Sequence, residues 1–243
     1  MRRTRFFAEG IHRSGERIEL AAGDAHALRV VLRARGGEAL EIVDSAGRAF
    51  DARVAFDGSR TFAELLGERA PAALPRLELV LAQALPKGDK LDLVVAKTTE
   101  LGVTEIVPFA CERSLARVSA AKLERWRRIA RSAARQCGLA RIPAVAEPAS
   151  FEALVARIAA SERVLLPWEL AETAPLRERL PVLLEGVRQV LIAIGPEGGF
   201  EAREVERACA AGAVAISLGT RILRTETAGL VLCAALRYAS GDL

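Results

Sequence analysis

Two segments near the C-terminus decide the fold: Ile194-Gly195-Pro196-Glu197-Gly198-Gly199-Phe200 and Leu218-Gly219-Thr220-Arg221-Ile222-Leu223-Arg224-Thr225-Glu226-Thr227-Ala228. Each follows a short apolar run that is typical of a strand, and each precedes a helix-like pattern. Neighbouring parallel strands end at the same edge of a sheet, so we expect two adjacent loops where open α/β sheets bind ligands. Glycines let the backbone approach a ligand closely, and the second loop adds Arg221, Arg224 and Glu226. The two loops predict a small-molecule cofactor site beside a polar reaction centre.

The chain from residue 76 to residue 243 alternates between strand-like and helix-like patterns. Such alternation predicts an α/β domain, with a mostly parallel sheet that is covered by helices on both faces. The expected strands are 77–84, 105–109, 163–166, 189–194 and 213–218, and the expected helices are 90–101, 120–137, 151–160, 201–211 and 225–238.

Residues 1–70 show a different pattern, in which apolar and polar residues alternate in short runs. This pattern predicts a small β-barrel domain with one short helix near residues 24–32. The segment 70–75 carries two prolines and is the expected linker between the two domains. Glycine-containing turn signals separate the runs at Arg35-Gly36-Gly37, Ser45-Ala46-Gly47 and Asp57-Gly58-Ser59.

The composition limits the class of protein. With 51% hydrophobic and 27% charged residues, the 243-residue chain is typical of a globular protein. No apolar run approaches the roughly 18 residues that a membrane helix needs. The basic start at Met1 to Arg5 is not followed by the apolar stretch of a signal peptide, so we expect a cytoplasmic protein.

The placement of cysteine and histidine argues against a metal site. The four cysteines lie far apart without a C-x-x-C pair, and both histidines, His12 and His26, lie in the N-terminal region. We therefore expect no metal, no disulfide and no histidine general base at the C-terminal loops. The cysteines are interpreted as small buried apolar residues: Cys111, Cys137, Cys209 and Cys233.

Positive charge is concentrated in one segment, although the net charge of the chain is only +4. Nine arginines and lysines lie from Arg113 to Arg141, against the single acid Glu124. Such a patch is expected of a protein that binds a polyanion such as nucleic acid. The alternative is a solvated basic helix face, and the charge pattern alone leaves both interpretations open.

Two common nucleotide-binding signatures are absent: no G-x-G-x-x-G follows a strand-like run, and no G-x-x-x-x-G-K-[ST] occurs. The C-terminal loops instead resemble those of the RsmE family, the ribosomal RNA small-subunit uridine-N3 methyltransferases of the SPOUT class. The resemblance rests on the two segments quoted above, and it covers nearly the whole chain. Supporting matches are Lys97-x-x-Glu100-Leu101-Gly102-Val103, Glu112-Arg113-Ser114, Trp126-x-x-Ile129, Gln136-Cys137 and Val31-Leu32-Arg33 behind His26.

The resemblance implies a particular architecture and activity. The C-terminal domain would be a trefoil-knotted SPOUT domain that binds S-adenosylmethionine, and the N-terminal domain would be a PUA-like barrel that helps to bind RNA. The protein would act as a homodimer on a uridine N3 of 16S ribosomal RNA in the small subunit, without a metal. Three loops would hold the cofactor, with the candidate residues Leu166, Pro167, Glu169, Gly195, Pro196, Glu197, Gly198, Gly199, Leu218, Gly219, Arg221 and Leu223.

Methyl transfer to uridine N3 requires a group that stabilises negative charge, because the imide proton leaves and the charge spreads over the flanking carbonyl oxygens. Arg224 is the candidate for this role, since a guanidinium is a planar and permanently charged donor. Glu226 would either orient Arg224 or accept the proton. Arginines of the barrel and of the basic helix are candidates for RNA contact: Arg2, Arg5, Arg29, Arg33, Arg113, Arg127 and Arg131.

Two positions depart from the family pattern. Arg135 stands where many relatives carry Glu, and Leu139 stands where they carry Arg, so no role in RNA or substrate binding is transferred to either residue. Two alternative functions stay open beside the leading one. The first is methylation of another base or of a ribose 2′-hydroxyl, and the second is a non-catalytic RNA-binding role in ribosome assembly.

Overall fold

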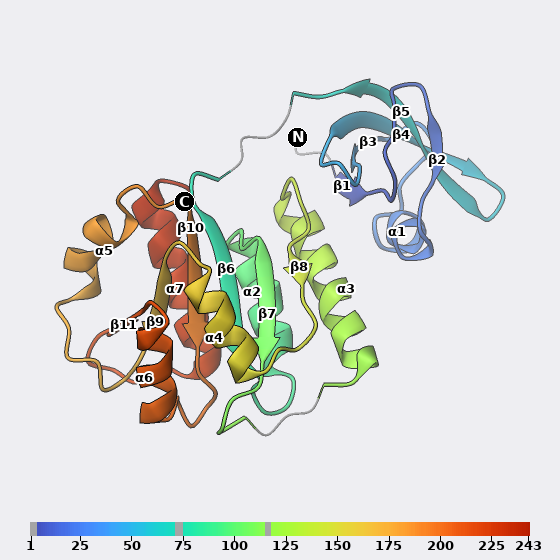
Figure 1. Ribbon diagram of the computed structural model, residues 1–243. Helices are drawn as coiled ribbons and strands as arrows, with labels where there is room; N and C mark the ends of the chain where they lie inside the picture. The colour runs from blue at the N-terminus through green and yellow to red at the C-terminus, as the bar shows by residue number, and fades with distance from the viewer. Residues whose placement is uncertain (1–3, 71–74, 115–117) are drawn as a thin grey trace. The chain divides into compact units, whose positions relative to one another are not determined.

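The computed structural model describes residues 4–70, 75–114 and 118–243 (Figure 1). Contacts between Cα atoms divide the chain into two compact units. The first unit consists of Met1–Leu74 together with Ala134–Arg141, and the second consists of Pro75–Ala133 together with Ile142–Leu243. Each unit is described by itself below.

The first unit is built on one five-stranded sheet with the order β1-β3-β4-β5-β2. β1 and β3 are parallel, and the remaining neighbours are antiparallel. No pairing joins β1 to β2 among the described residues, so the sheet is open there, and the closed barrel expected from the sequence is not seen. Its strands are β1 (Thr4–Phe7), β2 (Arg17–Glu19), β3 (Ala39–Val43), β4 (Ala49–Asp57) and β5 (Arg60–Glu68).

Local sequence explains the main hairpin of this sheet. Phe50, Ala52 and Val54 of β4 are buried while Arg53 between them is exposed, as expected for a strand with one face on a core. The strand turns into β5 through a two-residue loop, in which Gly58 adopts φ +55. A glycine at this position suits the type II′ turn that matches the twist of the two strands.

The helix expected near residues 24–32 is present but begins earlier and changes its winding. It consists of α1 (Ala22–His26), which continues directly as the π-helical segment η1 (Ala27–Val31). Its buried side chains join those of the strands in one apolar core, which includes Phe6, Leu28 and Phe50.

The second unit contains a six-stranded sheet with the order β11-β9-β10-β6-β7-β8. All of its registered strand pairs are parallel. This arrangement confirms the α/β class and the parallel sheet predicted from the alternating pattern. The strands are β6 (Glu78–Ala84), β7 (Glu105–Phe109), β8 (Ala144–Val145), β9 (Val164–Pro167), β10 (Gln189–Ile194) and β11 (Ala213–Ile216).

Helices cover both faces of this sheet, because successive strand residues point to opposite faces. In β6, Leu79 and Leu81 belong to one core cluster, whereas Val80 and Ala82 belong to the other. The first cluster includes side chains from α2 (Lys90–Glu100), α3 (Ala120–Cys137), α5 (Leu176–Leu184) and α7 (Thr225–Ser240). The second includes side chains from α4 (Phe151–Ala159) and α6 (Ala202–Ala210), which lie in front of the sheet in Figure 1.

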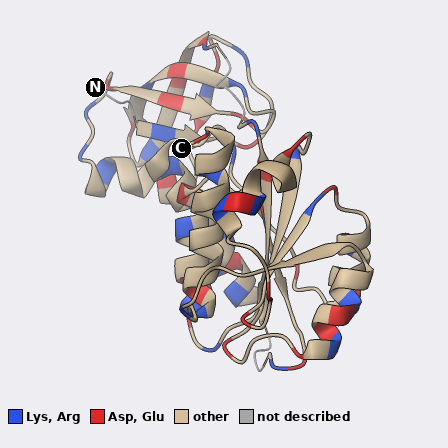
Figure 2. Cartoon of the chain, turned by 90° about the vertical axis from the view of Figure 1, so that its left-hand side faces the viewer, with Lys and Arg blue, Asp and Glu red and all other residues tan. Residues whose placement is uncertain are grey.

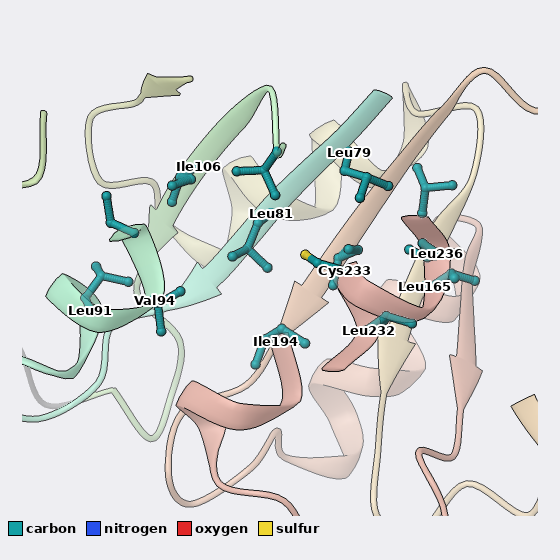
Figure 3. Packing of buried hydrophobic residues seen from close by; sticks show 14 of the residues in the cluster. Leu79, Leu81, Leu91, Val94, Ile106, Leu165, Ile194, Leu232, Cys233 and Leu236 are labelled. Carbon is teal, nitrogen blue, oxygen red and sulfur yellow. The ribbon is translucent and has the colours of Figure 1, made fainter. Parts of the chain in front are cut away.

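Helix α7 is packed deeply into the first cluster (Figure 3). Leu232, Cys233 and Leu236 are fully buried and lie close to side chains of β6 and β10. Each buried leucine contributes about 2 kcal/mol through removal of apolar surface from water. Burial raises the pKa of the Cys233 thiol to about 12, which agrees with its interpretation as an inert apolar residue. That interpretation is wrong for Cys209, whose side chain is exposed on α6.

The sheet order places three strand ends together. β9 lies between β10 and β11, and the three strands are parallel, so their carboxyl ends meet at one edge. The segments that follow these strands are those singled out in the sequence. In the described ranges, no helix has the length and apolar character needed to cross a membrane.

Candidate cofactor and catalytic site

A cavity of about 560 Å³ lies at the carboxyl ends of β9, β10 and β11. Three separate stretches of consecutive residues provide most of its wall: 167–169, 194–200 and 217–225. Lys90 from α2 and Ala228 from α7 complete it. The two C-terminal loops therefore converge on one cavity, as their positions after neighbouring parallel strands predict.

One hydroxyl group connects the two loops below the cavity. Thr225, the first residue of α7, donates a hydrogen bond of 2.5 Å from Oγ1 to the carbonyl oxygen of Gly195. The same Oγ1 accepts a hydrogen bond of 2.9 Å from Nε2 of Gln83, which is buried at the end of β6. The hydroxyl thus holds the loop after β10, the start of α7 and β6 in one arrangement.

Glycine is required at two positions of the first loop. Gly199 adopts φ +68, and a Cβ atom there would lie 2.8 Å from Oε1 of Glu169. At Gly195, a Cβ atom would lie 3.1 Å from the ring of Phe200. The backbone at Gly199 therefore approaches a carboxylate that itself lines the cavity.

Arg113 supports this loop from outside the cavity. Its guanidinium donates to the carbonyl oxygen of Gly198, and its Nε lies 3.1 Å from Oε1 of Glu201, the residue before α6. A Cβ atom at Gly198 would lie 3.1 Å from Cδ of Arg113. Arg113, predicted to contact RNA, is engaged here in holding the loop in place.

The opposite side of the loop is held by Lys90. Its Nζ lies 2.8 Å from Oε1 of Glu197 and 3.7 Å from Oε2 of Glu226. The hydrogen bond that Lys90 donates to Glu197 and the charges of both carboxylates raise the pKa of Lys90, although burial and the charge of Arg224 oppose this increase. Burial alone would raise the pKa of Glu197, but Lys90 and the backbone N–H of Lys87 hold it below its usual value. Both groups of this pair are therefore charged at neutral pH.

The two arginines of the second loop are free to meet a ligand. Arg221 and Arg224 line the cavity with exposed side chains. Neither guanidinium group makes a hydrogen bond or an ion pair with any other residue that the structure describes. In particular, Arg224 is not paired with Glu226, whose charge partner is Lys90. A direct ion pair by which Glu226 would orient Arg224 is thus not present in this arrangement.

Most of the cofactor candidates lie where the sequence places them. All of them line the cavity except Leu166. This residue is 1% exposed and packs in the second core cluster, on one face of the sheet. The candidates omitted Lys90 and Thr225, and also Trp168, which lies within the first stretch. A lysine at the predicted start of a helix, where the dipole disfavours a cation, was the available signal for Lys90.

The arginines predicted to bind RNA are in different situations. Arg5 forms a bidentate ion pair with Glu41 on the neighbouring strand and donates to the carbonyl oxygens of Gly138 and Leu139. Arg29 donates to Thr61 and to the carbonyl oxygens of Gly58 and Arg60, and its guanidinium lies over the ring of Phe56. These two side chains are occupied within the first unit.

The basic segment after Arg113 is less free than its composition suggests. Arg127 lies 2.5 Å from Glu124 and 3.2 Å from Glu147, and Arg131 has partners of its own. Figure 2, a cartoon coloured by residue type, shows acidic residues among the basic ones along the helices. Arg33 is exposed and has no partner among the described residues, and Arg2 lies outside them.

The departures from the family pattern have a structural explanation at one position. Arg135 lies 3.2 Å from Asp24 and places its guanidinium over the ring of Phe6, all within the first unit. The arginine thus supports the packing of that unit. In the part of the chain that the structure describes, no three His, Cys, Asp or Glu side chains form a group that could hold a metal ion.

Comparison with known proteins places the chain among RNA methyltransferases. Residues 73–237 match the family model of the RNA methyltransferase domain. The ribosomal RNA small subunit methyltransferase E of Synechocystis is 34% identical over 225 residues, which cover 89% of this chain and 71% of that protein. The chain belongs to the ribosomal RNA small subunit methyltransferase E family.

Solved structures extend this family relationship to the whole fold. A methyltransferase of Legionella pneumophila in complex with S-adenosylmethionine superposes with a TM-score of 0.89 at 30% identity, over 98% of both chains. The ribosomal RNA small subunit methyltransferase E of Neisseria gonorrhoeae, also bound to S-adenosylmethionine, gives a TM-score of 0.87 at 30% identity over 98% of both chains. Members of the methyltransferase E family are thus similar to this protein in both units.

Proposed function

We propose that this protein uses S-adenosylmethionine to methylate N3 of a uridine in the 16S ribosomal RNA of the small subunit. The observation that carries the proposal is the single cavity that the two C-terminal loops form. Membership of the methyltransferase E family supports the activity, and two similar structures with bound S-adenosylmethionine support the cofactor. An rRNA substrate also supports a cytoplasmic location.

We further propose the finer features of the fold that the family implies. The parallel order of β11, β9 and β10, with three loops converging at their ends, supports a trefoil-knotted SPOUT domain. The five-stranded sheet of the first unit supports a PUA-like domain that contacts RNA, with residues 1–70 and 76–243 as the functional domains. A homodimer that acts without a metal completes the proposal.

The residues of the cavity fit S-adenosylmethionine. The glycines at positions 195, 198 and 199 let the backbone pack closely against Phe200, Arg113 and Glu169, and this compact loop lines the cavity with main-chain groups that can contact a ligand. Glu169 lines the cavity with no partner among the described residues, and a carboxylate suits a ligand that carries a sulfonium and an ammonium. The cofactor, when bound, supplies an electrophilic methyl group. The remaining work of the site is to place the uridine and stabilise its charge.

Arg224 is the residue that we assign to charge stabilisation. It lines the cavity at the start of α7, and its guanidinium has no competing partner in the described chain. As the N3 proton leaves, negative charge develops on the flanking uracil oxygens, and a positioned guanidinium stabilises it. Glu226 stays a candidate for the proton acceptor. Holding N3 in line with the methyl group supplies the rest of the acceleration.

The first test removes this guanidinium. Arg224→Ala should lower methyl transfer to small-subunit RNA about a hundredfold while S-adenosylmethionine binding changes little, because the lost interaction is made in the transition state. Arg177→Ala removes an exposed arginine of α5 and serves as the control. Turnover by Arg224→Ala close to that of the wild type would exclude this role.

The second test identifies the target. Mass spectrometry of small-subunit RNA from cells without this protein should show the loss of N3-methyluridine and its return when the gene is restored. Loss of a different methylated base or of a 2′-O-methyl group would support a different target. Failure to bind S-adenosylmethionine in calorimetry would support a non-catalytic assembly factor.

A further inference from the structure

Lys90 occupies a position that helix stability does not explain. It is the first residue of α2, where the helix dipole disfavours a positive charge. The preceding residue, Asp89, makes no side-chain cap. The position of this lysine must therefore be accounted for by its partners in the cavity wall.

Those partners come from two other elements. The ammonium group of Lys90 is hydrogen-bonded to Glu197 in the loop after β10, and it lies 3.7 Å from Oε2 of Glu226 in the first turn of α7. The Glu226 side chain is only 13% exposed, and its Oε2 is buried without a hydrogen bond. A buried carboxylate is costly unless a charge compensates it, and Lys90 is the cation that lies within ion-pair distance of Glu226 among the described residues.

A second cation, Arg224, lines the same cavity as Lys90 and is the potential competitor for Glu226. Arg224 precedes Glu226 by two residues, and its charge acts on Lys90, so the three groups form one electrostatic cluster. A guanidinium binds a carboxylate more favourably than an ammonium does, because it donates two parallel hydrogen bonds. If Arg224 were paired with Glu226, its charge would be neutralised before a uracil could use it.

We propose that Lys90 is a positioning residue that engages Glu226 and thereby keeps the guanidinium of Arg224 free to face the acceptor base. The identity of the acceptor rests on the function proposed above. The competition between the two cations for one carboxylate is a property of the chain itself. The two parts can therefore be tested separately.

The kinetic test compares two changes at Lys90. Lys90→Met should lower kcat about tenfold or more with less than about a threefold change in the Kd of S-adenosylmethionine, since the backbone N–H of Lys87 still holds Glu197. Lys90→Arg should restore most of the rate. The double variant Lys90→Met/Glu226→Gln lacks the carboxylate that would capture Arg224, and it is used for labelling and not for kinetics because Glu226 is itself a candidate proton acceptor. Lys97→Met removes a lysine of the same helix that is paired with Glu100 outside the cavity, and it is the control.

A Lys90→Met variant with the kcat of the wild type would overturn the proposal. That result would mean that the guanidinium of Arg224 stays available without Lys90. Loss of S-adenosylmethionine binding in Lys90→Met, with no change in kcat at saturation, would also overturn it. The role of Lys90 would then be limited to the cofactor loop.

The second readout requires no activity. Phenylglyoxal modifies free guanidinium groups, and peptide mass spectrometry reports the rate at Arg224 in the ligand-free protein. The rate should fall about threefold in Lys90→Met and recover in the double variant, since an ion-paired guanidinium is less accessible to the reagent. An unchanged rate in Lys90→Met would contradict the proposal. If the wild-type protein failed to methylate RNA, the proposed function would fail, but this labelling result would still decide the role of Lys90.

Discussion

At the scale of single residues, the cavity depends on backbone conformations that only glycine adopts without strain. Gly199 combines φ +68 with a Cβ position 2.8 Å from the carboxylate of Glu169. The positive φ affects the stability of the fold, and the contact with Glu169 affects the binding of the ligand. A side chain at this position would push Glu169 aside, because the carboxylate is the movable end of a flexible residue.

Gly199→Ala should therefore have two effects of different origin. The left-handed backbone should cost about 1 kcal/mol of unfolding free energy. Displacement of Glu169 should also lower the affinity for S-adenosylmethionine about tenfold. Denaturant unfolding and calorimetry measure these two quantities.

The matched control is Gly186→Ala, at φ +71 with no neighbouring atom within 4 Å of the new Cβ. It should lose similar stability and bind the cofactor normally. Equal cofactor affinity in both variants would show that Glu169 does not take part in binding.

At the scale of elements, the site depends on a contact between the ends of strands and the start of a helix. Thr225 is a buried residue with 6% of its surface exposed. Its hydroxyl joins Gln83 of β6 to Gly195 after β10. Gln83 is fully buried, and its Oε1 already lacks a partner, so its amide depends strongly on this hydroxyl.

Thr225→Val keeps the shape of the side chain and removes both hydrogen bonds. It should lower the free energy of unfolding by about 2 kcal/mol, because the Gly195 carbonyl loses its hydrogen bond and the buried Gln83 amide is left with a long one of 3.4 Å to the carbonyl oxygen of Ala84. Cofactor affinity should fall with it, since the loop after β10 is no longer joined to α7. Urea unfolding and calorimetry give the two values.

The control for this change is Thr99→Val. Thr99 is also fully buried in the second unit, but its hydroxyl bonds only to the carbonyl oxygen of Val95 within α2. Its loss should cost less than about 1 kcal/mol. If the two variants were equally stable, the Thr225 hydroxyl would not connect the loops in solution.

The sequence predicts the elements that carry strong periodic patterns and misses those with conflicting signals. β7, α3 and β10 have the predicted bounds. Helix α5 was missed because Pro181 lies inside it, and proline removes a helical hydrogen bond. Strand β8 has only two residues, which is too short for any alternating pattern.

The same contrast holds for the site. The loop residues could be predicted because glycines and charges follow apolar runs in consecutive positions. For Lys90 the sequence offers only its unfavourable place at a helix start, because its partner Glu197 is 107 residues away and the contact depends on the order of strands. The partners of Arg5 and Arg127 were hidden for the same reason, so a count of basic residues overstated the free positive charge.

At the scale of the whole molecule, the last residues are joined to the start of the sheet in the second unit. Asp242 accepts hydrogen bonds from the backbone N–H groups of Arg76 and Leu77 and lies 3.2 Å from the guanidinium of Arg237. Arg237 is 2% exposed and donates to the carbonyl oxygens of Leu101 and Gly102. Burial alone would raise the pKa of Asp242, but the backbone N–H groups of Arg76 and Leu77 and the charge of Arg237 hold this pKa below its usual value.

Asp242→Asn should destabilise the protein by about 1–2 kcal/mol at pH 7. Because the folded pKa is lowered, the contribution of Asp242 is complete above its unfolded pKa of about 3.9 and is lost as the pH falls through the folded pKa. The difference between wild type and variant should therefore shrink below about pH 4. Glu178→Gln, at an exposed position on α5, is the control for charge alone. A difference that stays constant with pH would contradict this account.

Salt dependence tests which arginines meet RNA phosphates. Arg33 is exposed without a partner in the described chain, whereas Arg127 is paired with two carboxylates. Arg33→Ala should reduce the slope of log affinity against log salt by about one, as expected for the loss of one phosphate contact. Arg127→Ala should change it by less than half as much. Filter binding with small-subunit RNA at several salt concentrations gives the slopes. A larger change in slope for Arg127→Ala than for Arg33→Ala would exclude Arg33 as a phosphate contact.

The loop from Gly195 to Gly199 is fastened on both flanks, by Arg113 on one and by Lys90 on the other. The conformational entropy of ordering this segment is consequently lost when the polypeptide folds, before any small molecule arrives. A preorganised receptor of this kind binds without an additional ordering penalty. Substitutions that make this loop more rigid can then increase the affinity for the cofactor without adding any new contact to it.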